Sequence, residues 1–162
     1  MRRAFKFRLY PNANQERDLE TMREAHRRLY NACLDERKMA HEAEKRTVRY
    51  TEQSAKFTEA RKTNPFYANL TFSSAQATMR RLDKASKAFF ARAKQKMGKP
   101  GSPRFKGRDR FDSVEFPAYG DGVRLNGARL RAQAVRNEVM VVLHREVEGK
   151  IETVTLKREA DR

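Results

Sequence analysis

The chain has 162 residues, and its 37 Lys and Arg against 21 Asp and Glu give a net charge of +16. A single cysteine, Cys33, excludes an internal disulfide and a cysteine-based zinc site, and no apolar run approaches the roughly 20 residues that span a bilayer. Hydrophobic residues make up 38% of the chain and charged residues 36%. We therefore expect one domain, or two small interlocked ones, in the cytoplasm, with a polyanion and not a membrane as partner.

The positive charge is concentrated in one part of the chain. Residues 76–110 carry 12 basic and 2 acidic side chains, whereas residues 1–75 carry 16 and 10, and residues 111–162 carry 9 of each. A surface that only keeps a protein soluble does not require such clustering. The distribution favours a nucleic-acid contact within residues 76–110.

The first predicted elements are a strand and a long helix. Residues 3–10 (RAFKFRLY) alternate, with Phe5, Phe7 and Leu9 on one face, which is typical of a half-buried strand. A helix is expected over residues 14–45, capped by Asn12 or Asn14. Its apolar stripe consists of Leu19, Met22, His26, Leu29, Cys33 and Ala40. His26 and Cys33 lie on this stripe, so we interpret both as core residues in preference to functional ones.

Two more helices are predicted. Thr51 is expected to cap a second helix that ends at Asn64-Pro65, and residues 64–71 form a connector. A third helix over residues 72–97 is capped near Thr71 or Ser73. Its apolar face is opposed by Gln76, Arg80, Arg81, Lys84, Lys87 and Arg92. A solvated face usually mixes charges, but this column contains one acid, Asp83, so we predict that it contacts phosphates.

The stretch 98–110 (GKPGSPRFKGRDR) follows the third helix and contains three glycines, two prolines and five basic residues. We interpret it as the return path from the helix to the strands. Phe105 is expected to plug the junction. The column of cations would be extended by Arg104, Lys106, Arg108 and Arg110.

After residue 111 the hydrophobic period changes to two, which indicates about four or five strands. Asn126-Gly127 predicts a hairpin turn, residues 135–138 the start of the next strand, and Glu148-Gly149 another turn. The N-terminal strand cannot stand alone, so we place it beside these strands. The predicted fold is therefore α+β: a small β-barrel, residues 1–11 and 106–162, with about three helices, residues 12–105, inserted between its first and second strands.

The sequence shows no catalytic set, metal site or cofactor motif. His26, His41 and His144 are scattered, and neither a P-loop nor a GxGxxG is present. The acids near the basic region are Asp112, Glu115 and Asp121, which lie on a predicted strand and turn, and we do not expect them to bind a metal ion. Cleavage of a phosphodiester by metals needs several converging carboxylates. We therefore predict that the chain alone binds nucleic acid without cutting it.

Six motifs occur in an order that resembles one protein family. They are FKFRLYP, RRLYNACLDER, YTEQS, LDKASKAFF, GSPRFKGRDRFDS and LHREVEGKIETVTLKRE. This order resembles the N-terminal half of TnpB, also called OrfB, a protein of bacterial insertion sequences related to type V CRISPR effectors. The resemblance implies a wedge-like β-barrel interrupted by a helical recognition domain, in a bacterial or archaeal protein at the nucleoid.

The resemblance also implies partners and site residues. Family members are RNA-guided DNA endonucleases, whose second half holds a RuvC nuclease and a zinc element that have no positions in these 162 residues. The implied partners are guide RNA from a transposon end and double-stranded DNA with a short adjacent motif. Tyr50 and Gln76 match the region that faces this DNA, and PRFKGRDR matches a region along the nucleic-acid backbone. The structural alternatives are a packing role for Tyr50 and simple solvation for Gln76.

Three other functions stay open on the sequence alone. The chain could be one half of a split endonuclease that needs a separate RuvC-type chain. It could be a nuclease-less, RNA-guided repressor, or the inert remnant of a decayed element.

Overall fold

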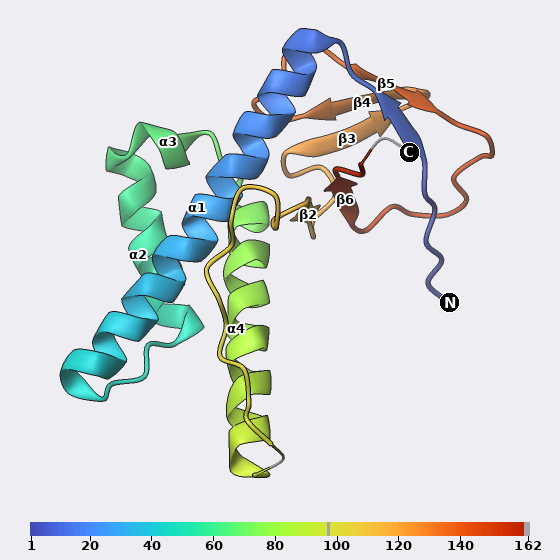
Figure 1. Cartoon of the computed structure of the whole chain (residues 1–162). Helices are drawn as coiled ribbons and strands as arrows, with labels where there is room; N and C mark the ends of the chain where they lie inside the picture. Colours follow the sequence, from blue (N-terminus) through green and yellow to red (C-terminus); the bar gives the residue numbers. More distant parts are fainter. Residues whose placement is uncertain (97, 161–162) are drawn as a thin grey trace.

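Figure 1 shows the chain in a computed structural model, which describes residues 1–96 and 98–160. Strand β1 (Arg8–Tyr10) leads into the long helix α1 (Ala13–Glu44). The helices α2 (Tyr50–Thr63), α3 (Pro65–Ala68) and α4 (Phe72–Lys94) follow. Five short strands complete the described chain: β2 (Ser113–Phe116), β3 (Val123–Asn126), β4 (Arg129–Ala132), β5 (Val139–Val142) and β6 (Val154–Lys157). The α+β class and the insertion of helices after the first strand are confirmed.

Within the described residues the strands form two antiparallel sheets, which hydrogen bonds do not join into one barrel. One sheet has the order β1-β5-β4-β3, and the other pairs β2 with β6. Both sheets contribute to a single apolar cluster, which includes Val114, Val123, Val139 and Val141, and α1 adds Met22 to it. A second cluster lies among the helices, and Phe111 joins it from the segment before β2.

The predicted strand over residues 3–10 is too long. Strand β1 begins at Arg8, because its partner β5 ends at Val142, directly opposite Arg8, and leaves residues 3–7 without a ladder. The predicted alternation still continues in the burial pattern, since Phe5, Phe7 and Leu9 are half-buried.

Helix ends agree with the sequence where a side-chain cap is present. Asn12 caps α1, accepting from the backbone N–H of Gln15 at 2.9 Å, and Thr71 caps α4 through Ser74. The prediction for Thr51 was wrong: Arg49 is the N-cap of α2, and the Glu52 carboxylate accepts its backbone N–H at 2.9 Å. The third predicted helix ends at Lys94, before residue 97, and Met97 lies outside the described residues.

Two turn predictions in the β-region need correction, and one agrees. The hairpin loop between β3 and β4 is Gly127-Ala128, one residue later than predicted, with Gly127 at a φ of 58°. Residues 135–138 do not start a strand, because Ala134 and Asn137 have positive φ angles of 65° and 58° that turn the chain. Gly149 has a φ of 81°, in agreement with the predicted turn there.

Candidate nucleic-acid interface

Helix α4 forms the scaffold of the candidate interface and is held on three sides. Ala75, Met79 and Leu82 are fully buried, and the helix packs against α1, α2 and β2. At its start, a Cβ on Gly122 would overlap the side chain of Thr71, so glycine is needed at position 122, where φ is 84°.

A buried chain of hydrogen bonds fixes the first turn of α4. Thr71 Oγ1 donates to Ser74 Oγ at 2.6 Å, and Ser74 Oγ lies 2.9 Å from Nε2 of His26 on α1. His26 Nδ1 lies 2.7 Å from the carbonyl oxygen of Met22, so Nδ1 carries the proton and Nε2 accepts from Ser74. Burial lowers the pKa of His26 to about 4. The structure thus confirms His26 as a core residue, neutral at pH 7.

The outward face of α4 carries the predicted column of cations. At 100° per residue, Gln76, Arg80, Lys84 and Lys87 lie on one side of the helix. Arg80, Lys84 and Lys87 are exposed and Gln76 is half-buried. Lys87 pairs with Asp83 at 2.8 Å, while the same carboxylate accepts from Arg37 of α1 at 3.2 Å.

Tyr50 and Arg80 meet at the edge of this column. The guanidinium carbon of Arg80 lies 5.3 Å from the centre of the Tyr50 ring, although the two residues come from α2 and α4. The Tyr50 hydroxyl is buried and has no hydrogen-bond partner within the described residues. A buried hydroxyl without a partner is costly, so a turn of the ring that brings this oxygen to the surface would be favoured by a ligand that hydrogen-bonds it.

Arg81 does not share the outward face. Its guanidinium donates to the carbonyl oxygen and to Oγ of Ser113 at 3.2 and 3.3 Å, and lies 4.9 Å from the Phe111 ring centre. Burial lowers the pKa of Arg81. Its position, about 100° around the helix from Arg80, turns it toward β2. Arg81 therefore fastens the helix to the sheet.

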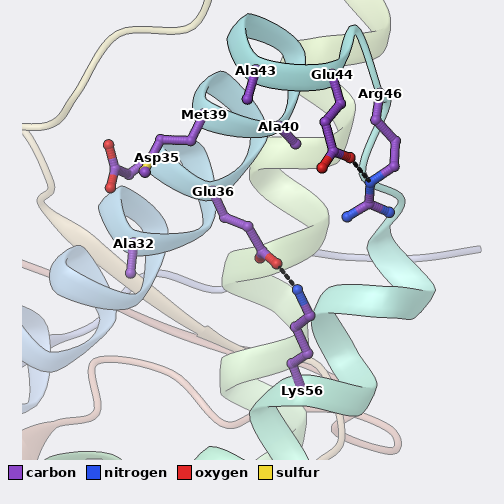
Figure 2. Close-up of a pocket in the computed structure, with 9 residues that line it drawn as sticks. All are labelled: Ala32, Asp35, Glu36, Met39, Ala40, Ala43, Glu44, Arg46 and Lys56. Carbon is purple, nitrogen blue, oxygen red and sulfur yellow. Dashed lines mark hydrogen bonds and ion pairs between the residues drawn. The ribbon is translucent and has the colours of Figure 1, made fainter.

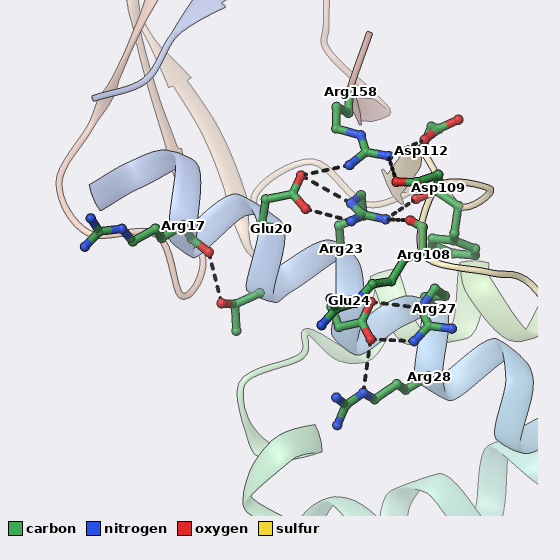
Figure 3. Close-up of polar contacts among 12 residues, drawn as sticks. Arg17, Glu20, Arg23, Glu24, Arg27, Arg28, Arg108, Asp109, Asp112 and Arg158 are labelled. Atoms are coloured by element: carbon green, nitrogen blue, oxygen red, sulfur yellow. Dashed lines mark hydrogen bonds and ion pairs between the residues drawn. The ribbon is translucent and has the colours of Figure 1, made fainter. Parts of the chain in front are cut away.

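The return segment, residues 98–110, runs back along α4, and its second half is held against α1 (Figure 1). Asn31 donates to the carbonyl oxygen of Lys106 at 2.9 Å and accepts its backbone N–H at 2.8 Å. Arg27 donates to the same carbonyl at 2.8 Å, and Arg23 donates to the carbonyl of Arg108 at 2.6 Å (Figure 3). The backbone is thus fixed while most of its side chains stay outside.

The side chains of the return segment divide into two groups. Arg104, Arg108 and Arg110 are exposed, whereas Lys106 is half-buried, with Nζ 5.8 Å from the Tyr30 ring centre. The prediction for Phe105 was wrong: its side chain is 48% exposed and lies under the Lys38 ammonium instead of filling the junction.

Sequence reasoning missed Asn31, Arg23 and Arg27, the side chains that position the return segment. Both arginines also pair within α1, Arg23 with Glu20 at 2.6 Å and Arg27 with Glu24 at 2.5 Å. The hydrogen bond from Arg27 lowers the pKa of Glu24 to about 2, against the effect of burial. The i, i+3 spacing of these pairs was the available signal that the two arginines are structural.

A shallow pocket of about 450 Å³ lies beside the second half of α1 (Figure 2). Glu36 pairs there with Lys56, and Glu44 lies 3.8 Å from Arg46. Asp35 adds a third carboxylate to the lining. Its lining therefore mixes three carboxylates with two cations, and the cationic surfaces of α4 and the return segment lie outside it.

Other candidate groups do not converge on a reaction centre. Asp112 pairs with Arg158 at 3.1 Å, Asp121 accepts from the backbone N–H of Ser73, and Glu115 lies in β2. Within residues 1–96 and 98–160, no three His, Cys, Asp or Glu side chains are placed to hold a metal ion. Burial and the nearby Glu36 raise the pKa of Cys33 to about 12, so this thiol is not a nucleophile at pH 7. None of the helices described is long and apolar enough to cross a membrane.

Comparison with known proteins identifies relatives of part of this chain. Residues 1–46, which form β1 and α1, match the model of the OrfB family described as a helix-turn-helix domain. A Streptomyces pristinaespiralis protein named "Putative RNA-guided DNA endonuclease" is 34% identical over 110 residues. The aligned part is 67% of this chain and 26% of that relative, so the match spans about a quarter of the relative's length.

Proposed function

This chain matches the N-terminal region of the TnpB/OrfB family, and from this premise we propose that it binds guide RNA and target-adjacent DNA without cleaving either. The observation that carries the proposal is the placement of Tyr50 against Arg80, at the edge of an exposed cationic helix face. The arrangement supports a nucleic-acid-binding module, and we propose that this module works in the cytoplasm, at the nucleoid.

Each residue of the interface has a role in this proposal. Gln76 hydrogen-bonds a base edge, and Tyr50 turns its ring on binding so that its hydroxyl meets a phosphate or sugar oxygen. Backbone phosphates are bound by Arg80, Lys84, Lys87, Arg104, Lys106, Arg108 and Arg110. Arg81, which the sequence placed among the phosphate-binding residues, instead positions α4, because its guanidinium already donates to Ser113.

We also propose the division into a wedge-like part, residues 1–11 and 106–162, and an inserted recognition part, residues 12–105. The two apolar clusters, one among the strands and one among the helices, support it. Met22 and Phe111 cross the boundary, so the two parts would move as one body.

A split endonuclease is the second candidate, because the aligned segment is 26% of its relative. A separately encoded RuvC-type chain would then supply cleavage. A nuclease-less repressor would instead occupy DNA without a second protein chain and without cleaving the DNA. The remnant hypothesis predicts a chain that melts without a cooperative transition, which a thermal scan measures.

The decisive experiment is the recovery of RNA with the protein. The chain is purified from its host with and without nuclease treatment, and the RNA bound to it is sequenced. Enrichment of a transposon-end transcript supports the proposal. Its absence, together with salt-independent binding to duplex DNA, would overturn it.

Tyr50→Phe tests the site itself. Because the hydroxyl has no partner in the described chain, its removal should leave the midpoint of thermal unfolding unchanged or slightly higher. Binding of a labelled DNA duplex should weaken by roughly 5- to 10-fold, the equivalent of about one hydrogen bond. Thr58→Ala, on the exposed side of the same helix, is the control. Equal duplex affinities for Tyr50→Phe and the unmodified chain would refute a role for this hydroxyl.

A further inference from the structure

The outer face of the four-stranded sheet has an unusual composition. Strand alternation sends the inward set, such as Leu130, Val139 and Val141, into the apolar cluster. The opposite set is exposed on all four strands and consists of Arg8, Tyr10, Arg124, Asn126, Arg129, Arg131, Met140 and Val142. These residues form the surface that we call the sheet face.

The sheet face is cationic although residues 111–162 as a whole are neutral. It carries four arginines and no acid, and none of the four forms an ion pair with any residue that the structure describes. Arg124 lies directly opposite Arg131 in the β3–β4 ladder. Like charges in this position destabilise a sheet, so the pair favours a bound anion over a purely structural purpose. The nearest acid along these strands, Glu138, precedes β5.

An apolar strip crosses the same face. Tyr10, Met140 and Val142 are 51%, 59% and 42% exposed. In the register, Tyr10 lies opposite Met140, and Met140 lies opposite Arg129. The Arg8 guanidinium carbon is 5.0 Å from the centre of the Tyr10 ring. An accessible aromatic ring therefore lies beside one guanidinium, on an open sheet whose other strands carry three more arginines.

We propose that the sheet face binds unpaired RNA, with a base stacked against Tyr10 and phosphates held by Arg8, Arg124, Arg129 and Arg131. Charge complementarity selects a polyanion, and the ring selects unpaired bases, because those of a duplex are stacked away from side chains. The choice of RNA rests on the proposed function, which supplies an RNA partner. The sheet face is built by β1, β3, β4 and β5, so it is separate from the interface on α4.

The test uses the full chain and fluorescence anisotropy with a labelled 20-nucleotide oligouridine, the matching oligothymidine, and a DNA duplex. Tyr10→Ala should bind oligouridine about tenfold more weakly, within the range for base–aromatic stacking. The double variant Arg129→Gln/Arg131→Gln should lower the slope of log K against log salt by about 1.4, for two phosphate contacts on a single strand. The matched control is Arg61→Gln/Lys62→Gln in the last turn of α2, which removes the same charge.

Stability separates a lost contact from a damaged fold. Arg131→Gln relieves the repulsion with Arg124, so its melting temperature should stay equal or rise while its affinity for oligouridine falls. Misfolding cannot produce this combination.

The remaining outcomes decide between the two interfaces. Unchanged oligouridine binding by Tyr10→Ala and by the double variant would overturn the inference, whereas loss of duplex binding in Lys84→Gln/Lys87→Gln would still uphold the α4 interface. Tighter binding of oligothymidine than of oligouridine would overturn the assignment to RNA.

Discussion

His26 shows how a single buried side chain supports the interface. It joins α1 to the first turn of α4 through Ser74, and this turn precedes Gln76 and Arg80. Because its neutral form is required for both hydrogen bonds as they stand, its protonation would force Ser74 to reorient. The position of the cationic helix face thus depends on the charge state of one imidazole.

This dependence predicts a loss of stability in mild acid. The pKa of His26 falls from 6.5 to about 4 on folding, so between these values the unfolded chain binds the extra proton. The free energy of unfolding should therefore decrease as the pH falls from 7 to 5, by about 2 kcal/mol. Urea unfolding at pH 7, 6 and 5 measures it, with His26→Gln as the non-titrating control. If the free energy of unfolding falls equally with pH in both proteins, His26 is not the group that takes up the proton on unfolding.

At the scale of elements, the return segment is an example of irregular backbone made rigid by a neighbouring helix. Asn31 satisfies both the N–H and the carbonyl of Lys106, as a paired strand would. Arg27 and Arg23 continue the contact along α1. The exposed arginines of this segment are therefore presented from a fixed backbone, which lowers the entropic cost of binding a phosphate chain.

Asn31→Ala should release this segment. The substitution leaves the backbone N–H of Lys106 without its partner, and we expect a loss of about 1–2 kcal/mol in the free energy of unfolding. Trypsin should cut faster after Arg104, Lys106 and Arg108, which mass spectrometry of the fragments measures. Asn69→Ala, at the exposed end of α3, is the matched control. If trypsin cleaves the variant and the unmodified chain at the same rate, Arg23 and Arg27 of α1 are enough to hold the return segment in place.

At the scale of the whole molecule, positive charge is concentrated on particular surfaces. Cations cover the outward side of α4, the return segment and the sheet face, whereas the pocket beside the end of α1 mixes three carboxylates with Arg46 and Lys56. A polyanion would be attracted to the cationic surfaces. The charge distribution therefore limits the orientations in which nucleic acid can approach.

The same distribution predicts a strong effect of salt. The proposed duplex interface includes six exposed cations, which are Arg80, Lys84, Lys87, Arg104, Arg108 and Arg110. If all are engaged, the slope of log K against log salt is about −5, and the affinity falls roughly a thousandfold between 50 and 200 mM. Anisotropy with a labelled duplex measures the slope. A value shallower than −2 would mean that these residues do not act together.

The sequence was informative where local pattern decides structure and weaker where distant partners decide it. The caps at Asn12 and Thr71 and the buried side of α4 follow from local spacing. The role of Arg81 depends on Ser113, 32 residues away, and that of the return segment on Asn31, 75 residues away. The length of β1 depends on where β5 ends. No local pattern contains these partners.

The pairing of β1 with β5 has a consequence for synthesis. Tyr10 leaves the ribosome 130 residues before its ladder partner Met140. At roughly 5–20 residues per second, the interval is about 7–26 s. During that time Phe5, Phe7 and Leu9 have no sheet to join, whereas α1 to α4 can already assemble. Strand β1 is thus translated before β2, β3 and β4 but can pair only after β5 has emerged, and its apolar side chains stay without their sheet for this interval.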